Sequence, residues 1–379
     1  MESQPATPVP TARQSLRNVR SVVIKLGSQL LIDKTSALDA PFLAAVAAQV
    51  AALSKRGVRV SIVSSGAVAA GLKELGLPKR PADLGKLQAV AAVGQRRLMD
   101  TWAAAFAPHG LHVAQVLLTR EDIDSRTRFL NLRNTIHAIH ELGAIPVVNE
   151  NDTISTDEIV KITFGDNDIL AALVANALRA ELLVLLSVVD GILDAHSQPV
   201  RLIDDIATAK SLVRTEKSAL GKGGMNSKVE AARTVTGSGE AMVLANGRMP
   251  DVLTRILDGD ETVGTLFVPA SRKRSSRSRW IDSARPAGSI VVDDGCATAL
   301  RKNKSLLPAG VVRVEGTFDP GDVVAVTSAT DGQTIARGLT NYTATDIEKI
   351  RGKKSTEVRA LLAEGAYDEV IHRDNLVLS

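Results

Sequence analysis

The sequence predicts an α/β protein in which a doubly wound, mainly parallel sheet is followed by a second, smaller, mainly β domain. Short β-branched or Leu-rich runs recur up to about residue 270, and amphipathic helical patterns lie between them. Beyond residue 286 the strand-like runs are instead separated by turn residues. At 379 residues, the chain is also long enough to form two domains.

Six apolar runs in the first part are interpreted as strands. They span residues 22–24, 58–63, 113–118, 145–148, 182–186 and 241–244. Runs without polar alternation are typical of strands that a parallel sheet buries on both faces.

Three segments between these strands carry apolar residues on one helical face. The first begins at Asp39, a capping residue, and ends at Gly57. Its apolar face contains Phe42, Leu43, Val46, Val50 and Leu53. The other two segments cover residues 129–139, ahead of Gly143, and residues 169–178. We therefore expect helices on the faces of the sheet.

The smaller domain is predicted from four further strand-like runs, at residues 289–292, 311–314, 323–326 and 334–336. The pairs at 294–295, 320–321 and 331–332 are interpreted as turns between them. The complete division is a disordered tail over 1–18, the α/β domain over 19–270, a basic linker over 271–286, and the small β domain with a C-terminal tail over 287–379.

Composition excludes several classes of protein. The net charge of +4 comes from a basic segment, Arg272, Lys273, Arg274, Arg277 and Arg279, without which the chain carries about −1. Aromatic residues make up 3%, which argues against stacking platforms for single-stranded nucleic acid. One cysteine excludes an intrachain disulfide and a multi-cysteine zinc site.

We expect a cytoplasmic protein without a membrane span. No apolar stretch approaches ~20 residues, the length that crosses a bilayer. Residues 1–18 lack the apolar run of a signal peptide, and a transit peptide is the alternative to a disordered tail. The single cysteine fits a reducing compartment.

Polar residues follow four of the predicted strands, at 25–28, 64–66, 149–152 and 187–191. In an open parallel sheet, ligands bind beyond the carboxyl ends of the strands. Lys25 stands where a buried strand would ordinarily continue apolar, and Gly27 allows a ligand close to the backbone. Alone, Lys25 is equally well explained as a lysine that snorkels at the sheet edge.

The glycine-rich segment 221–228 leads into a helical pattern and is a candidate anion site. A cation in a first helical turn is disfavoured by roughly 0.3–1 kcal/mol. Lys222 and Lys228 therefore suggest a bound polyanion that offsets this conflict, and a flexible surface loop is the alternative.

The segment 165–168 precedes a predicted helix, so Asp166 is a natural N-cap and Asp168 falls in the first turn. Capping alone would explain one of these acids. A functional role is favoured by the neighbouring residues, because Asn149, Asp152 and Asn167 together offer amide and carboxylate groups that suit a zwitterionic amino acid, whose ammonium needs an acid and whose carboxylate needs donors.

Other catalytic classes lack their motifs. The chain contains neither G-x-x-x-x-G-K-[ST], nor G-x-G-x-x-G after a strand, nor G-x-S-x-G. His137, His140 and Glu141 have metal-like spacing but lie on an ordinary helical pattern without a third ligand, so we assign no metal site. Two lysines, glycine-rich loops and an acid instead indicate phosphoryl transfer by positioning and charge neutralisation.

Together these motifs resemble the glutamate 5-kinase branch of the amino-acid kinase family. The segments are KLGS at 25–28, SSGAVAAG at 64–71, QVLLTR at 115–120, RFLN at 128–131, VNEND at 148–152, FGDND at 164–168 and GGMNSK at 223–228. The segments at 305–310, 316–318, 320–322 and 336–342 resemble a PUA domain. The resemblance covers the chain from about residue 19 to its end.

The resemblance implies Mg-dependent phosphorylation of L-glutamate by ATP to L-glutamyl 5-phosphate, the first step of proline biosynthesis. Lys25, Asp168 and Lys228 would be catalytic. Ser65, Asn149, Asp152 and Asn167 would bind glutamate. ATP would contact Lys25, Ser187, Val188, Lys222, Gly223, Gly224, Met225, Asn226, Ser227 and Lys228.

Two positions depart from this pattern. Val188 stands where the family usually has an acid, so an acid contact that bears on nucleotide affinity or choice is missing. Lys222 replaces the common small hydroxyl residue, and it either adds a phosphate contact or faces solvent. Proline feedback inhibition and a dimer or tetramer are further expectations from the resemblance. A sibling kinase that acts on aspartate or a phosphate monoester is the nearest alternative. An RNA-binding protein is the alternative from another class, because PUA domains commonly bind RNA and the basic segment adjoins this one.

Overall fold

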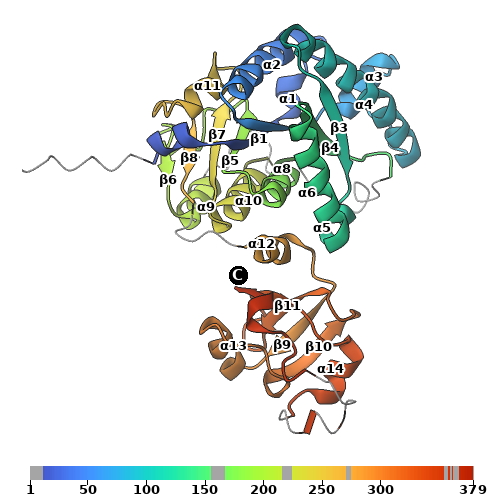
Figure 1. The fold of residues 1–379 in the computed structure, drawn as a ribbon, viewed down its shortest axis with the longest axis vertical. Coiled ribbons are helices and arrows are strands. Elements are labelled where there is room, and N and C mark those ends of the chain that lie inside the picture. Colours follow the sequence, from blue (N-terminus) through green and yellow to red (C-terminus); the bar gives the residue numbers. More distant parts are fainter. Residues whose placement is uncertain are drawn as a thin grey trace, which may run out of the picture. The chain divides into compact units, whose positions relative to one another are not determined.

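The computed structural model describes residues 12–154, 167–215, 224–269, 275–353, 357–358, 361 and 367–378. The chain divides into two compact units (Figure 1). The first unit comprises Met1–Asp122 and Thr127–Lys273, and the second comprises Ile123–Arg126 and Arg274–Ser379. Among the described helices, none combines the length and the hydropathy that crossing a bilayer requires.

The first unit is built on an eight-stranded sheet with the order β3-β4-β2-β1-β5-β7-β8-β6. Its strands are β1 (Ser21–Leu26), β2 (Arg59–Val63), β3 (Val113–Leu118), β4 (Ile145–Glu150), β5 (Leu182–Ser187), β6 (Leu202–Ile203), β7 (Ala241–Asn246) and β8 (Thr265–Phe267). All neighbouring strands are parallel except β7 and β8. The predicted mainly parallel sheet is confirmed, and β6 and β8 are additional to the six predicted strands.

Helices cover both faces of this sheet (Figure 1). They are η1 (Gln14–Asn18), α1 (Ser28–Leu31), α2 (Ala40–Lys55), α3 (Ala67–Glu74), α4 (Leu84–Phe106), η2 (Ala107–His109), α5 (Arg120–Asp124), α6 (Arg126–Glu141), α8 (Asn167–Leu178), α9 (Ile206–Thr215), α10 (Gly224–Gly237) and α11 (Val252–Leu257). The predicted cap of α2 is present, because Asp39 Oδ1 accepts a hydrogen bond from the Phe42 amide at 3.0 Å. Gly57, just past its end, has a φ of 79°.

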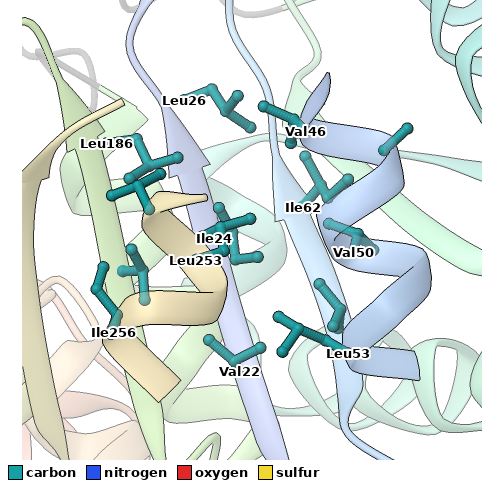
Figure 2. Close-up of a cluster of buried hydrophobic side chains, with 14 of the residues drawn as sticks. Val22, Ile24, Leu26, Val46, Val50, Leu53, Ile62, Leu186, Leu253 and Ile256 are labelled. Carbon is teal, nitrogen blue, oxygen red and sulfur yellow. The ribbon is translucent and has the colours of Figure 1, made fainter. Parts of the chain in front are cut away.

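Strand β1 lies at the centre of the core (Figure 2). Val22, Ile24 and Leu26 point to one face, where α2 and α11 pack against them. Each such side chain contributes about 1.5–3 kcal/mol when fully buried. The intervening residues, Val23 and Lys25, point to the opposite face, which α8 covers. The alternation of the strand therefore directs Lys25 towards α8.

The expected disordered tail is wrong for the part of it that the structure describes. Residues 14–18 form η1, and Leu16 is buried. The Arg13 guanidinium donates to the carbonyls of Val263 (2.7 Å), Gly264 (3.0 Å) and Arg201 (2.9 Å). Burial, reinforced by Arg201, lowers the pKa of Arg13 to about 10. The polar composition of the segment does not reveal these distant carbonyl partners.

The second unit has a five-stranded sheet with the order β10-β9-β11-β12-β13. Its elements are α12 (Ser276–Ser283), β9 (Gly288–Val292), α13 (Asp294–Arg301), η3 (Pro308–Gly310), β10 (Val311–Gly316), β11 (Val323–Ser328), β12 (Thr334–Leu339), α14 (Ala344–Ile350), η4 (Arg373–Asn375) and β13 (Leu376–Leu378). The four predicted strands are confirmed. The predicted turn at 294–295 is wrong, because Asp293 caps α13 by accepting from the Cys296 amide at 2.7 Å.

The predicted basic linker contains a helix, α12. Ser275 caps it by accepting from the Ser278 amide at 3.1 Å. Arg279 and Trp280 are buried, and Arg337 donates to the carbonyl of Asp282 at 2.6 Å. The apolar Trp280 and Ile281 stabilise a packed helix, so only part of the segment is solvated.

Helices α3 and α4 cross at two glycines, Gly71 and Gly94, where the backbones approach too closely for a larger residue. A Cβ at Gly94 would lie 1.8 Å from the Ala67 carbonyl oxygen, whereas one at Gly85 on the same helix would lie 3.6 Å from its nearest neighbour, Asp83 Oδ1. We expect Gly94→Ala to lower the free energy of unfolding by about 2–4 kcal/mol through forced backbone displacement. Gly85→Ala is the control and should be neutral or slightly stabilising. Urea denaturation measures both, and equal effects would contradict the close crossing.

Candidate active site

The carboxyl ends of β1, β2, β4, β5 and β7 meet at one edge of the sheet. The chain proceeds from β1 to β2 on one side and later returns to pair β5 with β1 on the other. Lys25, near the end of β1, thus lies at the point where the strand order reverses, which is where open α/β sheets bind ligands. Helices α8 and α10 begin at the same edge, since Asp168 in the first turn of α8 contacts Lys228 at the start of the second turn of α10.

Lys25, Asp168 and Lys228 form a buried ionic triad. Lys25 Nζ lies 2.5 Å from Asp168 Oδ1, and Lys228 Nζ lies 2.8 Å from Asp168 Oδ2. The three residues expose only 3%, 0% and 8% of their surface, so bulk water screens their charges little. With two ammonium groups and one carboxylate, the triad carries a net charge of about +1.

Asp168 remains ionised in this arrangement. Burial alone would raise the pKa of its carboxyl group, but the charges and hydrogen bonds of Lys25 and Lys228 outweigh burial and hold the pKa below its ordinary value. An acid that only capped a helix would not need two lysines from other elements. Asp168 is therefore the counter-ion of Lys25 and Lys228, which helix capping alone does not explain.

The start of α10 reinforces the triad. Lys228 Nζ donates to the Gly224 carbonyl at 3.0 Å, and Ser227 Oγ donates to the same oxygen at 3.0 Å. Ser227 Oγ also lies 3.3 Å from Asp168 Oδ2. These contacts fix the first turn of α10 against α8. The amino ends of both helices therefore add positive potential to the triad.

A second polar cluster involves Asn167, the residue before Asp168. Asn167 Nδ2 shares its two hydrogens among Ser65 Oγ (2.7 Å), the Ser64 carbonyl (2.8 Å) and Asn149 Oδ1 (3.0 Å). Because Ser65 Oγ accepts here, its own hydrogen is left for another acceptor. Three predicted substrate residues are thus brought together, Ser65 from the β2–α3 junction and Asn149 and Asn167 from the two ends of the β4–α8 connection.

Two further residues that support this cluster were not predicted from the sequence. Gln95 on α4 is buried, and its Oε1 accepts from Asn149 Nδ2 at 2.8 Å. Trp102, also on α4, donates from Nε1 to Ser64 Oγ at 3.2 Å. A signal existed for Gln95, since it is a polar residue on the apolar stripe formed by Ala91 and Leu98.

The remaining predicted site residues are located here only by the element on which they lie. Asp152 lies on the turn after β4, and Ser187 ends β5, followed by the exposed Val188. Gly224, Met225 and Asn226 form the first turn of α10. Lys222 and Gly223, like the proposed cap Asp166, lie outside the described residues.

The described residues offer no ready protein ligand set for Mg²⁺. Across the ranges described, no group of three or more His, Cys, Asp or Glu side chains could hold a metal ion. Both oxygens of Asp168 already face ammonium groups. In protein sites Mg²⁺ is commonly held by substrate phosphates with few carboxylates. An ion here fits only as part of a bound phosphate compound.

Two protein-family models match the chain. Residues 20–246 match the model of the amino acid kinase family, and residues 288–362 match that of the PUA domain.

Relatives match over nearly the whole chain. A glutamate 5-kinase from Geobacter sp. (strain M21) is 46% identical over 375 residues, which cover 97% of this chain and 99% of that protein. One from Chromohalobacter salexigens is 45% identical over 387 residues, covering 100% and 99%. Among solved structures, carbamate kinase from Giardia lamblia bound to AMP-PNP has a TM-score of 0.50 at 15% identity, covering 67% of this chain and 100% of that one. This last similarity concerns the fold alone.

The triad predicts a pH-dependent contribution to stability. Asp168→Asn leaves two buried ammonium groups without their counter-ion, so it should lower the free energy of unfolding by about 3–5 kcal/mol at pH 7. The pKa of Asp168 is lowered by folding, so the difference from wild type should persist down to about pH 4 and shrink as pH falls through the folded-state pKa.

Fluorescence of Trp102 in a Trp280→Phe background measures unfolding of the first unit, because the chain has two tryptophans. Asp100→Asn is the matched control, since its ion pair with Arg96 is exposed and should change stability by less than about 1 kcal/mol. A difference that already fades near pH 6 would contradict the lowered pKa.

Proposed function

The chain belongs to the amino acid kinase family and carries a PUA domain, and we propose that it phosphorylates the side-chain carboxylate of L-glutamate with ATP, yielding L-glutamyl 5-phosphate and ADP. The relatives that match nearly its whole length are named glutamate 5-kinases. The observation that carries the proposal is the buried triad of Lys25, Asp168 and Lys228. In the cell this reaction would begin proline biosynthesis.

The triad is suited to a transferring phosphoryl group. Lys25 and Lys228 approach from β1 and α10, and Asp168 between them orients both ammonium groups before a ligand arrives. Preorganised charges in a site shielded from water stabilise the charge of the transition state more strongly than flexible surface charges do. We assign phosphate contact to the two lysines and their orientation to Asp168.

Nucleotide binding is proposed for the adjoining junctions. Residues Gly224 to Ser227 offer the amino end of α10 to the phosphates, and Ser187 and Val188 lie at the carboxyl end of β5. Mg²⁺ would enter with ATP, held by phosphate oxygens, and would neutralise part of their charge.

The acceptor is proposed to bind at the amide cluster. Ser65 and Asn149 would donate to a carboxylate of glutamate, and Asp152 would accept from its ammonium. The Asn167 amide holds Ser65 and Asn149 in place. The cluster and the triad are adjacent, because Asn167 precedes Asp168 on α8.

The chemical step needs no general base. A carboxylate oxygen of glutamate forms a bond to the γ-phosphorus, the bond from that phosphorus to the oxygen bridging to the β-phosphate breaks, and ADP leaves with the electron pair. No proton moves, since the acceptor is already an anion at neutral pH. What the step requires is relief of repulsion between acceptor and phosphates, which supports roles for Lys25 and Lys228.

Proline as a feedback inhibitor, assembly into dimers or tetramers, and a cytoplasmic location belong to the same proposal and derive from the family resemblance. We do not extend the proposal to RNA. Arg279 of the basic segment is buried, which reduces the positive surface that the described part of the segment offers to a polyanion.

The substrate is tested by a coupled assay of ADP release. We expect turnover with L-glutamate that exceeds turnover with L-aspartate or N-acetyl-L-glutamate by at least about tenfold, because one methylene or a blocked ammonium changes the fit at the amide cluster. Absence of glutamate-dependent ADP release would refute the proposed substrate. Preference for aspartate would indicate the sibling kinase instead.

The triad is tested by removing one charge. Lys228→Ala should lower kcat by about 10²–10³-fold, because a preorganised charge at the phosphoryl group is lost. Lys210→Ala is the matched control, since Lys210 forms an exposed ion pair with Glu230 at 3.2 Å. The control should keep kcat within about twofold. Near-normal kcat in Lys228→Ala would exclude Lys228 from the mechanism.

A further inference from the structure

A second concave site lies at the opposite edge of the same sheet, where β2, β3 and β4 begin. This pocket has a volume of about 370 Å³, within the range of small-molecule sites. Its polar lining consists of Ser54, Lys55, Arg59, His109 and His140, and no carboxylate lines it. The apolar walls are formed by Ala51, Val58, Val60, Leu111, Ala144 and Ile145.

Within the part of the chain that the structure describes, neither Lys55 nor Arg59 forms an ion pair with a carboxylate. Arg56, the residue after Lys55, is different, because its guanidinium lies 2.9 Å from Asp258. Among the described residues, the pocket therefore contains two cationic side chains without a paired carboxylate, whereas the neighbouring Arg56 has one.

His140 forms the inner wall of the pocket, and the positive charge of Arg59 affects its pKa. Burial, reinforced by the positive charges of Arg59 and His137, lowers its pKa to about 4. Its Nε2 lies 3.0 Å from Ser61 Oγ on β2. In the tautomer in which the serine hydroxyl donates to Nε2, the other ring nitrogen, Nδ1, carries a hydrogen and can donate to a ligand.

The backbone amides at the rim of the pocket already donate to other acceptors and so do not bind a ligand. The amides of Gly57, Gly143 and Ala144 all donate to carbonyls of the preceding helices. Ligand contacts would therefore come from side chains, namely an ammonium, a guanidinium and imidazoles. This donor set suits oxygen atoms that share a multiple negative charge.

We propose that this pocket is a binding site for a compact multivalent oxyanion, bound by Lys55 and Arg59 at its mouth and by His140 at its inner wall. Phosphate compounds and tricarboxylates share this chemistry. The site lies at the amino ends of the strands, whereas the ionic triad lies at their carboxyl ends. It is therefore independent of the proposed kinase function.

Isothermal titration calorimetry of the full chain with pyrophosphate, inorganic phosphate and citrate tests the proposal, with ionic strength held constant. We expect saturable binding of at least one of these anions, weakened at least tenfold, about 1.4 kcal/mol, by Arg59→Ala and by Lys55→Ala. Preference for pyrophosphate or for citrate identifies the phosphate or the carboxylate source.

Arg56→Ala is the matched control, because it removes the same charge from a neighbouring position whose side chain is already paired with Asp258. It should change affinity by less than about twofold. Both arginines and Lys55 are at the surface, so the variants should fold, which circular dichroism checks. The proposal is overturned if wild type binds none of the three anions, if Arg59→Ala and Lys55→Ala bind like wild type, or if Arg56→Ala weakens binding equally.

Discussion

The contact of Asp168 with two lysines is the constraint on which the site depends. Two buried ammonium groups repel each other, and the carboxylate between them, at 2.5 and 2.8 Å, offsets that repulsion. Lys25 comes from β1, Asp168 from α8 and Lys228 from α10. The triad therefore requires the strand order and helix packing of the whole first unit.

The core provides the rigidity that this arrangement needs. Alternate residues of β1 are buried under α2 and α11, which turns Lys25 towards α8 (Figure 2). The crossing of α3 and α4 at Gly71 and Gly94 brings Gln95 against Asn149. Helices packed on both faces of the sheet thus position the polar groups at its edge. The candidate site is therefore held by elements that are far apart in the sequence.

The two edges of the sheet differ in how charge is handled. At the carboxyl ends, Lys25 and Lys228 surround an acid and helix amino ends converge. At the amino ends, Lys55 and Arg59 lie beside the neutral His140 without a facing acid. A parallel sheet places all loops of one kind at one edge, so the two groups of cationic side chains lie at opposite ends of the strands.

The sequence by itself determined the mainly parallel α/β fold, the four strands of the second unit and the polar junctions at Lys25, Asn149 and Asn167, because these depend on local patterns of apolar and polar residues. Only the tertiary structure decided which partners the polar groups have. Asp168 could have been a cap until Lys228, sixty positions away, was placed beside it. Gln95, Arg13 and Arg279 likewise owe their burial to distant segments. A local pattern records which face of an element is buried, but it does not record what lies on the other side of the contact.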